Sequence, residues 1–387
     1  MKVPFLNCRA IALFTIVMGF LQPSILNAQI YSIPPKFDYA SSFSEGLAIV
    51  RVGNKYGYIN PDGKLVIPLT DYDNVYPFSE GYARVLKGKK FGFIDKAGRL
   101  VIDFKYGYAS EFKDGLSVIS YEDLSLGNMF QLKKGAINKN GKVVINPYLG
   151  VLFNFNNGIA VANFGFIGDP SVGVINKSGE VLTPGKFEYI TRFQDGIAAA
   201  LTTDNGWGLI SPDGKWISPP HFDGISHFQE GLAVFVDCGG KIHKPYNFSK
   251  NLNCKAGYID NTGKIVIQPQ FSSAEEFSES RAAVSFSVFN YHGSSLSMDI
   301  NSNALFGFID KTGLITVEPI YKEVRPFKNG VAAVRKPNRE SKNEKWGFID
   351  RDGKELTSFI YSYAGSYSEG LAPVKTSSGK WGFIRFQ

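Results

Sequence analysis

Short runs of alternating hydrophobic and polar residues dominate the chain after residue 30, and glycine, proline, asparagine or aspartate bounds each run. The stretch from Phe93 to Ile102 is typical, because two apolar runs flank a turn that begins at Asp95 and ends at Gly98. Aspartate at the start of a tight turn bonds its own backbone, and glycine supplies the positive φ at its end. The pattern predicts short antiparallel strands rather than helices.

Two phrases recur between these turns. In the first, an aromatic or small residue precedes Gly, and usually an aromatic residue and Ile follow; the second reads Phe-Ser-Glu-Gly-Leu-Ala-x-Val or a variant of it. Each phrase occurs nine times when degenerate copies are counted. The distance from the first glycine to the second is 23 or 24 residues in every unit, whereas the return distance varies from 11 to 27. Packing therefore fixes one half of the unit, and insertions enter the other half at one place.

The repeating unit reads as an antiparallel meander of three firm strands or four. A proline follows the turn in most units, and we expect it to end a strand because it cannot donate to a ladder; examples are Pro68, Pro147, Pro269 and Pro319. One such unit cannot bury a core, so stacked units should form one domain. We predict an all-β tandem array of about nine short antiparallel three- to four-stranded units.

The array is expected to be either a β-propeller-like ring or an open toroidal superhelix. Residues 30–35 align with the last strand of a unit, and the final unit stops after Ile384, before that strand. The two ends together would complete one unit, which favours a ring. Nine units and only three firm strands per unit argue against a propeller of the usual four to eight blades.

The segments 345–350 and 380–384, both built on Lys-Trp-Gly-Phe-Ile, resemble the bacterial WG-repeat (KWG-repeat) family, and the resemblance extends over essentially the whole chain after residue 28. Lys134, Val172 and Ala256 replace the aromatic residue in three copies, where we expect the aromatic stack to be interrupted. The resemblance implies a repeat fold and a non-enzymatic role, and it supplies no catalytic residue. Candidate repeat-core residues, with tryptophans packed between units and glycines that permit close backbone approach, are Trp207, Gly208, Trp346, Gly347, Trp381 and Gly382.

The first 28 residues read as a secretory signal peptide. Lys2 and Arg9 give it a basic start, and a short apolar run follows from Ala10 to Leu21. Ala28 offers a small residue at the cleavage point. An uncleaved membrane anchor is the alternative, although the run is short for a span and Pro23 interrupts it. We therefore divide the chain into a signal peptide, 1–28, and a WG-repeat β domain, 29–387. The protein should be exported to the periplasm, the cell surface or the medium.

Composition and charge exclude some partners. The chain is 44% hydrophobic and 20% charged, as in an ordinary globular protein. Its formal net charge is +7, and loss of residues 1–28 would lower it to +5. Because Lys and Arg are spread along the chain rather than concentrated, we expect no nucleic-acid partner.

Cys238 and Cys254 are the two cysteines left after the leader, and they flank one insertion. In an exported chain this arrangement predicts a disulfide bond. A metal site that uses both cysteines and His243 is the alternative, but no fourth ligand is evident and the spacing matches no familiar zinc pattern. We expect no metal and no cofactor.

Other chemistry-bearing patterns have simpler readings as turns. The Asp-x-Asp-Gly sequence that begins at Asp350 lacks the remaining calcium ligands of an EF-hand. Acids recur before the second glycine in the same register, as a turn would require, although a row of carboxylates could bind cations; they are Glu45, Glu80, Asp114, Asp195, Glu230 and Glu369. No nucleophile elbow, phosphate loop or paired histidine motif is present. We therefore expect a non-enzyme, with a hydrolase of unrecognised site as an alternative.

The longest insertions fall at 121–133, 163–171, 237–255, 286–305 and 336–345. Because they occupy the same position in the unit, they should emerge along one edge of the array. They carry six candidate binding residues: Tyr121, Tyr246, Phe248, Phe286, Phe289 and Tyr291. Exposed aromatics suit a protein partner or stacking on sugars. We expect a scaffold that binds a protein partner through this edge, with an envelope carbohydrate-binding module as the alternative.

Overall fold

The computed structural model describes residues 31–122, 133–165, 171–203, 205–239, 254–286, 304–337 and 344–386. Residues 31–387 form one compact unit. The predicted signal peptide lies outside the described residues, so the division at residue 28 stays a prediction.

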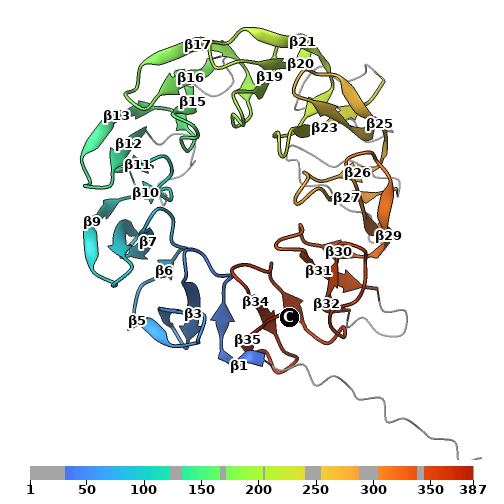
Figure 1. The fold of residues 1–387 in the computed structure, drawn as a ribbon. Coiled ribbons are helices and arrows are strands. Elements are labelled where there is room, and N and C mark those ends of the chain that lie inside the picture. Colours follow the sequence, from blue (N-terminus) through green and yellow to red (C-terminus); the bar gives the residue numbers. More distant parts are fainter. Residues whose placement is uncertain are drawn as a thin grey trace, which may run out of the picture. The chain divides into compact units, whose positions relative to one another are not determined.

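The described residues form nine small antiparallel sheets and contain no helix. The sheets follow one another round a ring, so the fold is a nine-bladed β-propeller (Figure 1). This confirms the predicted all-β array. We number the blades 1 to 9 from the sheet that contains β2.

Each blade begins with a two-residue strand near the ring centre, followed by a longer second strand (Figure 1). The innermost strands are β2 (Tyr39–Ala40), β6 (Asn74–Val75), β10 (Tyr108–Ala109), β14 (Val151–Leu152), β18 (Tyr189–Ile190), β22 (Gly224–Ile225), β26 (Ser273–Ala274), β30 (Glu323–Val324) and β33 (Tyr363–Ala364). The second strands are β3 (Ala48–Val52), β7 (Tyr82–Lys87), β11 (Leu116–Ser120), β15 (Ile159–Asn163), β19 (Ala198–Thr202), β23 (Leu232–Asp237), β27 (Ala282–Ser285), β31 (Val331–Lys336) and β34 (Ala372–Lys375).

The third strand of each blade carries the Trp-Gly phrase or its variant, and the fourth lies at the outer rim. The third strands are β4 (Lys55–Ile59), β8 (Lys90–Asp95), β12 (Lys134–Asn138), β16 (Val172–Asn176), β20 (Gly206–Ile210), β24 (Lys255–Asp260), β28 (Phe306–Ile309), β32 (Lys345–Asp350) and β35 (Trp381–Ile384). The outer strands are β5 (Leu65–Thr70), β9 (Leu100–Tyr106), β13 (Val143–Leu149), β17 (Val181–Phe187), β21 (Trp216–Phe222), β25 (Ile265–Phe271) and β29 (Ile315–Tyr321), with β1 (Tyr31–Phe37) in blade 9.

The ring closes through its first strand. β1 pairs antiparallel with β35, and Ile33 faces Phe383 while Phe37 faces Trp381. The N-terminal segment therefore supplies the outer strand that the last unit lacks, as the alignment of the two chain ends predicted. Of the two expected arrangements, the ring is the one observed.

The outer strands contain the recurring prolines, so the prediction that each proline ends a strand was wrong. Pro147 lies inside β13 and Pro319 inside β29. The outer strand is hydrogen-bonded on one side only, and its register against the third strand shifts at this point, between Phe306/Tyr321 and Phe308/Val317 in blade 7. A proline at a bulge in an edge strand removes no ladder bond.

The glycine of the Trp-Gly phrase faces this bulge. A Cβ added to Gly208 would stand 2.7 Å from the Ser218 carbonyl oxygen, and one added to Gly382 would stand 2.6 Å from that of Ile33. Contacts this short leave room only for glycine. Gly347 differs, because the ring of Phe359, 3.1 Å from such a Cβ, replaces the backbone there.

Blade 8 has three named strands, since its outer segment forms only the isolated bridges Trp346↔Tyr361 and Ile349↔Glu355. The Thr357 hydroxyl accepts a hydrogen bond from the Phe348 N–H at 3.0 Å in place of a ladder bond. This blade lacks the bulge proline, so its rim takes a different path.

The hydrophobic core lies between blades rather than within them. One cluster joins Phe383 of blade 9 to Phe43 and Val50 of blade 1, and another joins Ile67 of blade 1 to Phe78 of blade 2. Neighbouring units thus bury one another, as in other repeat proteins.

Candidate binding face

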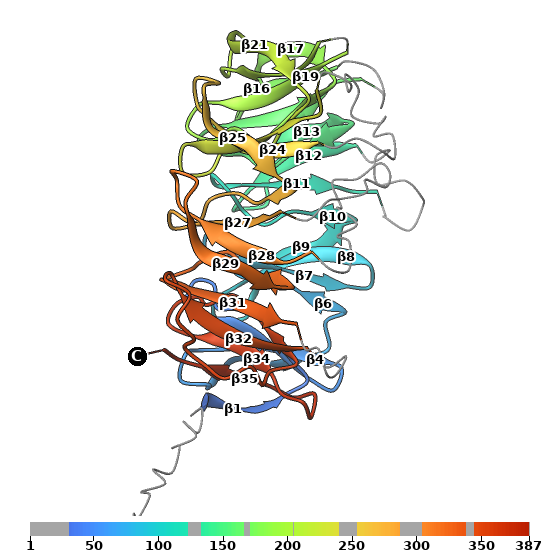
Figure 2. The ribbon, with the colours of Figure 1, turned by 90° about the vertical axis from the view of Figure 1, so that its right-hand side faces the viewer.

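The two faces of the ring carry different connections. The turn between the first and second strands lies on the same face as the turn between the third and outer strands, since the Lys96 ammonium of one reaches the Glu45 carboxylate of the other at 3.3 Å. We call this the turn face. Connections between the second and third strands emerge on the opposite face, which we call the loop face (Figure 2).

All five long insertions connect a second strand to a third strand, in blades 3, 4, 6, 7 and 8. The described ends of each insertion therefore lie on the loop face, as their common position in the repeat predicted. The strands that flank the insertions keep one geometry, so insertions of different length begin and end on a constant frame.

Two of the six candidate aromatic residues lie within the described part of the chain, at the bases of their insertions. Tyr121 is 46% exposed and its ring centre lies 5.3 Å from that of Tyr106. Phe286 is 41% exposed and lies 5.3 Å from Phe271 in the same way. Each ring thus packs on the end of the outer strand of the preceding blade, β9 or β25, and keeps part of its surface exposed. The other four lie outside the described residues: Tyr246, Phe248, Phe289 and Tyr291.

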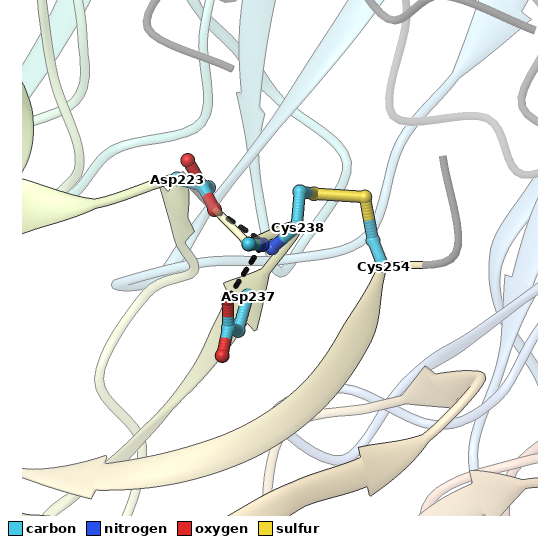
Figure 3. Close-up of a disulfide and its surroundings, with 5 residues drawn as sticks. Asp223, Asp237, Cys238 and Cys254 are labelled. Carbon is cyan, nitrogen blue, oxygen red and sulfur yellow. Dashed lines mark hydrogen bonds between the residues drawn. A yellow bond between two sulfur atoms is a disulfide. The ribbon is translucent and has the colours of Figure 1, made fainter. Parts of the chain in front are cut away.

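Cys238 and Cys254 form a disulfide bond, which confirms the predicted pairing (Figure 3). It joins the end of β23 to the start of β24 and so closes the blade 6 insertion at its base. The Asp223 carboxylate accepts a 2.7 Å hydrogen bond from the Cys238 N–H, and Asp237 accepts one of 2.8 Å from the Gly239 N–H. With the sulfur atoms joined, neither cysteine is a thiolate ligand for the alternative metal site, and His243 lies outside the described residues.

The tryptophans of the repeat phrase pair with tyrosines of the innermost strands. Trp346 of blade 8 lies 5.7 Å from Tyr363 of blade 9, which lies 5.3 Å from Trp381 of its own blade. Trp381 in turn lies 5.7 Å from Tyr39 of blade 1. These four rings form an aromatic ladder across two blade junctions. Trp207 pairs with Tyr189 within blade 5, also at 5.7 Å.

Lys134 occupies the tryptophan position in blade 3. Its Nζ lies 3.5 Å from the centre of the Tyr108 ring, and the residue is only 7% exposed. A cation–π contact therefore stands where other blades have an aromatic pair. Burial lowers the pKa of the Lys134 amine to about 8.

The Phe-Ser-Glu-Gly phrase links one blade to the next on the turn face at most junctions, a role that sequence reasoning missed. The carboxylate accepts a hydrogen bond from the glycine N–H one blade further on; Glu45, for example, accepts one from the Gly81 N–H at 2.9 Å. The serine hydroxyl donates to the next phenylalanine carbonyl, as from Ser44 to Phe78 at 2.8 Å. The same carboxylate bond joins Glu80 to Gly115, Asp114 to Gly158, Glu230 to Ser280, Glu279 to Gly330 and Glu369 to Gly46.

A cation completes several of these links. Lys96 bonds Glu45, and the equivalent turn residues Lys139, Lys311 and Arg351 bond Glu80, Glu230 and Glu279. Burial opposes ionisation of Glu45, but hydrogen bonds from the Gly81 N–H, Lys96 and the Glu80 N–H outweigh it, so its pKa is lowered. The acids that make these bonds are therefore occupied by the next blade, whereas Asp195 accepts a hydrogen bond from the Gln194 side chain at 3.2 Å.

The titratable side chains that could form a metal site or an acid–base pair lie mostly apart in the part of the chain that the structure describes. That part holds no cluster of three or more His, Cys, Asp or Glu side chains able to bind a metal ion. His227 pairs with Glu276 at 3.3 Å, and His221 Nδ1 lies 2.7 Å from the Pro219 carbonyl oxygen. Within the described ranges, no helix is long and apolar enough to cross a membrane.

Comparison with known families agrees with the repeat count. The family model described as "WG containing repeat" matches nine segments: 31–56, 56–91, 91–124, 135–165, 173–204, 207–241, 257–286, 306–338 and 346–381. No curated protein matches the chain.

Solved structures resemble the fold at low identity. A crystal structure described as the eukaryotic initiation factor is 9% identical with a TM-score of 0.58, and the match covers 89% of this chain and 92% of that one. BamB from Moraxella catarrhalis is 7% identical with a TM-score of 0.41, covering 92% and 99% of the two chains. The computationally designed Ika8 protein is 10% identical with a TM-score of 0.44, covering 92% and 99%. The first of these likenesses supports the propeller fold alone.

Proposed function

Because the chain belongs to the WG containing repeat family, we propose that it is an exported, non-catalytic scaffold of the cell envelope that binds a protein partner through its loop face. The observation that carries the proposal is the division between a constant ring and variable insertions, all on one face. A rigid frame that presents loops of differing length and sequence is the usual arrangement of a recognition surface.

The aromatic residues at the insertion bases support a protein partner. Tyr121 and Phe286 keep more than two fifths of their surface exposed while resting on buried rings. Aromatic side chains held in this way lose little rotamer entropy on binding and are common at the centres of protein interfaces.

Export is supported by the leader-like first 28 residues and by the disulfide at the base of the blade 6 insertion. Disulfide bonds persist in oxidising compartments and are rare in reducing ones. In this position the bond would limit the conformations of the insertion and lower the entropic cost of binding.

The test is a deletion series in the exported chain. Residues 240–253 and 287–303 are replaced together by short Gly-Ser linkers, and partners are captured from the native organism by cross-linking. A captured protein counts only if the purified partner binds the intact chain directly and loses at least about tenfold in affinity on the deletion variant, or roughly 1.4 kcal/mol.

A matched control carries substitutions on the turn face, Lys64→Gln and Lys142→Gln, which leave the insertions unchanged. Equal binding by the deletion variant and the intact chain would refute the proposal. So would equal losses in the deletion variant and the control, since the effect would then be independent of the loop face.

A further inference from the structure

The loop face carries no long insertion on blades 9, 1 and 2, which are consecutive in the ring. Their second and third strands are joined by short hairpins, from Lys375 to Trp381, from Val52 to Lys55 and from Lys87 to Lys90. The second and third strands of these three blades are therefore joined without a long insertion of their own. This sector borders the blade 3 insertion, because the Lys90 ammonium donates a hydrogen bond to the Tyr121 carbonyl oxygen at 3.0 Å.

The three hairpins are strongly basic. Residues 51–55, 87–90 and 375–380 contain seven lysine and arginine residues and no acid: Arg51, Lys55, Lys87, Lys89, Lys90, Lys375 and Lys380. The three hairpins lie far apart in sequence, so the chain shows only the short run from Lys87 to Lys90, and the closed ring gathers the other residues beside it. We call this group the cationic ledge.

Few carboxylates offset the ledge. Asp38 lies 2.6 Å from Lys380 and also accepts the Gly53 N–H at 2.7 Å. Asp73 accepts the Gly88 N–H at 2.7 Å, and the exposed Asp71 lies 3.5 Å from Lys87. Asp38 and Asp73 therefore accept hydrogen bonds from backbone N–H groups of the hairpins. Lys55 and Lys89 are exposed and make no ion pair with another described residue.

Aromatic rings and small polar groups border the ledge. Tyr39 and Tyr363 of the aromatic ladder are 39% and 38% exposed, and Arg51 lies over the Tyr56 ring at 6.0 Å. The hairpin tips carry hydrogen-bonding side chains, among them Ser377, which accepts from Lys345 Nζ at 3.1 Å. Cations, partly open rings and hydroxyls thus occur together on one surface.

We propose that the cationic ledge and the adjoining tyrosines bind an extended anionic polysaccharide. Carboxylate or sulfate groups spaced along such a chain would meet cations on successive blades, where charge complementarity attracts the polymer and positions it. The tyrosine rings offer apolar surface for the C–H faces of sugar rings, and the hairpin hydroxyls and amides can bond sugar hydroxyls. Neutral glycans lack the charge attraction, and acidic peptides lack the sugar rings whose C–H faces would contact the tyrosines.

The experiment measures binding of the intact protein to polygalacturonate, with dextran as the neutral polymer. The variant Lys55→Gln/Lys87→Gln/Lys89→Gln should bind polygalacturonate about tenfold more weakly, since each partly screened contact contributes a fraction of a kcal/mol. The matched control Lys64→Gln/Lys142→Gln/Lys264→Gln removes the same charge from the turn face and should bind as the intact protein does. Binding should weaken as salt rises from about 50 to 300 mM.

A second variant separates stacking from charge. Tyr39→Ala should weaken binding to polygalacturonate severalfold while leaving binding to poly-L-glutamate unchanged, with folding verified by circular dichroism. The proposal is overturned if both triple variants bind alike, or if dextran binds as tightly as polygalacturonate. Tighter binding to poly-L-glutamate or to a single-stranded oligodeoxynucleotide would also overturn it, because the preferred partner would then be an acidic protein or a nucleic acid.

Discussion

The carboxylate of Glu369 in blade 9 accepts a hydrogen bond of 2.8 Å from the backbone N–H of Gly46 in blade 1. Beside it, the Ser368 hydroxyl donates to the Phe43 carbonyl at 2.9 Å. These bonds repeat at the closure the link that joins other consecutive blades. The ring is therefore closed twice, by β1 on β35 at the outer rim and by this link on the turn face.

Replacing Glu369 should loosen the closure. We expect Glu369→Ala to lower the free energy of unfolding by about 1 kcal/mol, because it leaves the Gly46 N–H without its charged acceptor at a partly exposed site. Urea unfolding followed by fluorescence measures the change. Glu318→Ala, an exposed acid on β29, is the control and should have almost no effect. An equal loss in both variants would contradict a specific role for the Glu369 link.

The links between blades should also make stability depend on acid pH. The pKa values of Glu45, Glu230 and Glu279 are lowered from their ordinary value of 4.5, since hydrogen bonds from the next blade outweigh burial. A carboxyl whose folded pKa is depressed stabilises the fold above its unfolded pKa and loses that contribution as pH falls through the folded value. The melting temperature should therefore drop below about pH 4.5.

The variant Glu45→Gln/Glu230→Gln/Glu279→Gln tests this dependence. It should melt lower than the wild type at pH 7 and show a shallower fall between pH 4.5 and about pH 3, since three of the titrating links are gone. Superimposable pH profiles would show that other acids govern the acid transition.

The repeat and its turns were predictable because their chemistry is local. The 23-residue spacing and the Asp-x-x-Gly turns at Asp95 and Asp310 depend on residues within one unit. Closure was left open because it depends on the small rotation from unit to unit, which no single residue reports. Pro147 was wrongly predicted to end its strand. A proline can lie inside a strand that has a neighbour on one side only, and the sequence of one unit does not show that this strand is an edge strand.

The link made by Glu45 was missed because a turn alone explains the Ser-Glu-Gly phrase, and its partner lies in another unit. One signal was available. Glu45 adopts φ 53° and Gly46 φ 84°, a turn in which asparagine or glycine is the usual first residue. Recurrent glutamate at that position implies a tertiary bond that offsets the conformational cost. The ledge was missed for a similar reason, since its hairpins are distant in sequence.

The first strand should hold the ring closed through Ile33. This side chain is 1% exposed, sits in β1 opposite Phe383, and packs against Gly63 of blade 1. Ile33→Ala should cost about 2–4 kcal/mol through lost burial and a cavity. The measurement is thermal unfolding together with protease sensitivity of residues 31–37. Ser32→Ala, on the exposed face of the same strand, should leave both unchanged; an unaffected Ile33 variant would mean that β1 contributes little to closure.

The disulfide between Cys238 and Cys254 should stabilise the fold modestly. It closes a loop with a sequence separation of 16, for which the chain-entropy model gives about 3 kcal/mol. We expect Cys238→Ser/Cys254→Ser to unfold at a lower urea concentration than the oxidised wild type and to match the wild type treated with reductant. If oxidised and reduced wild type unfold together, the bond constrains only the insertion.

Lys134 should make blade 3 less stable at neutral pH than an apolar residue would. The amine is almost fully buried over Tyr108, and its pKa is lowered to about 8 by desolvation. The folded state releases this proton between about pH 8 and 10.5 while the unfolded chain retains it, so the penalty of burying the charge fades as pH rises through that range. Lys134→Met, of similar length and without charge, should therefore raise the free energy of unfolding at pH 7 by about 1–2 kcal/mol, after allowance for the lost cation–π contact. The stability advantage of the Lys134→Met variant should shrink toward pH 10.

Lys105→Met, which replaces an outer-strand lysine over Tyr106 at 5.3 Å, is the control and should show no such trend. A Lys134 variant that is less stable than wild type at every pH would show that the cation–π contact outweighs desolvation.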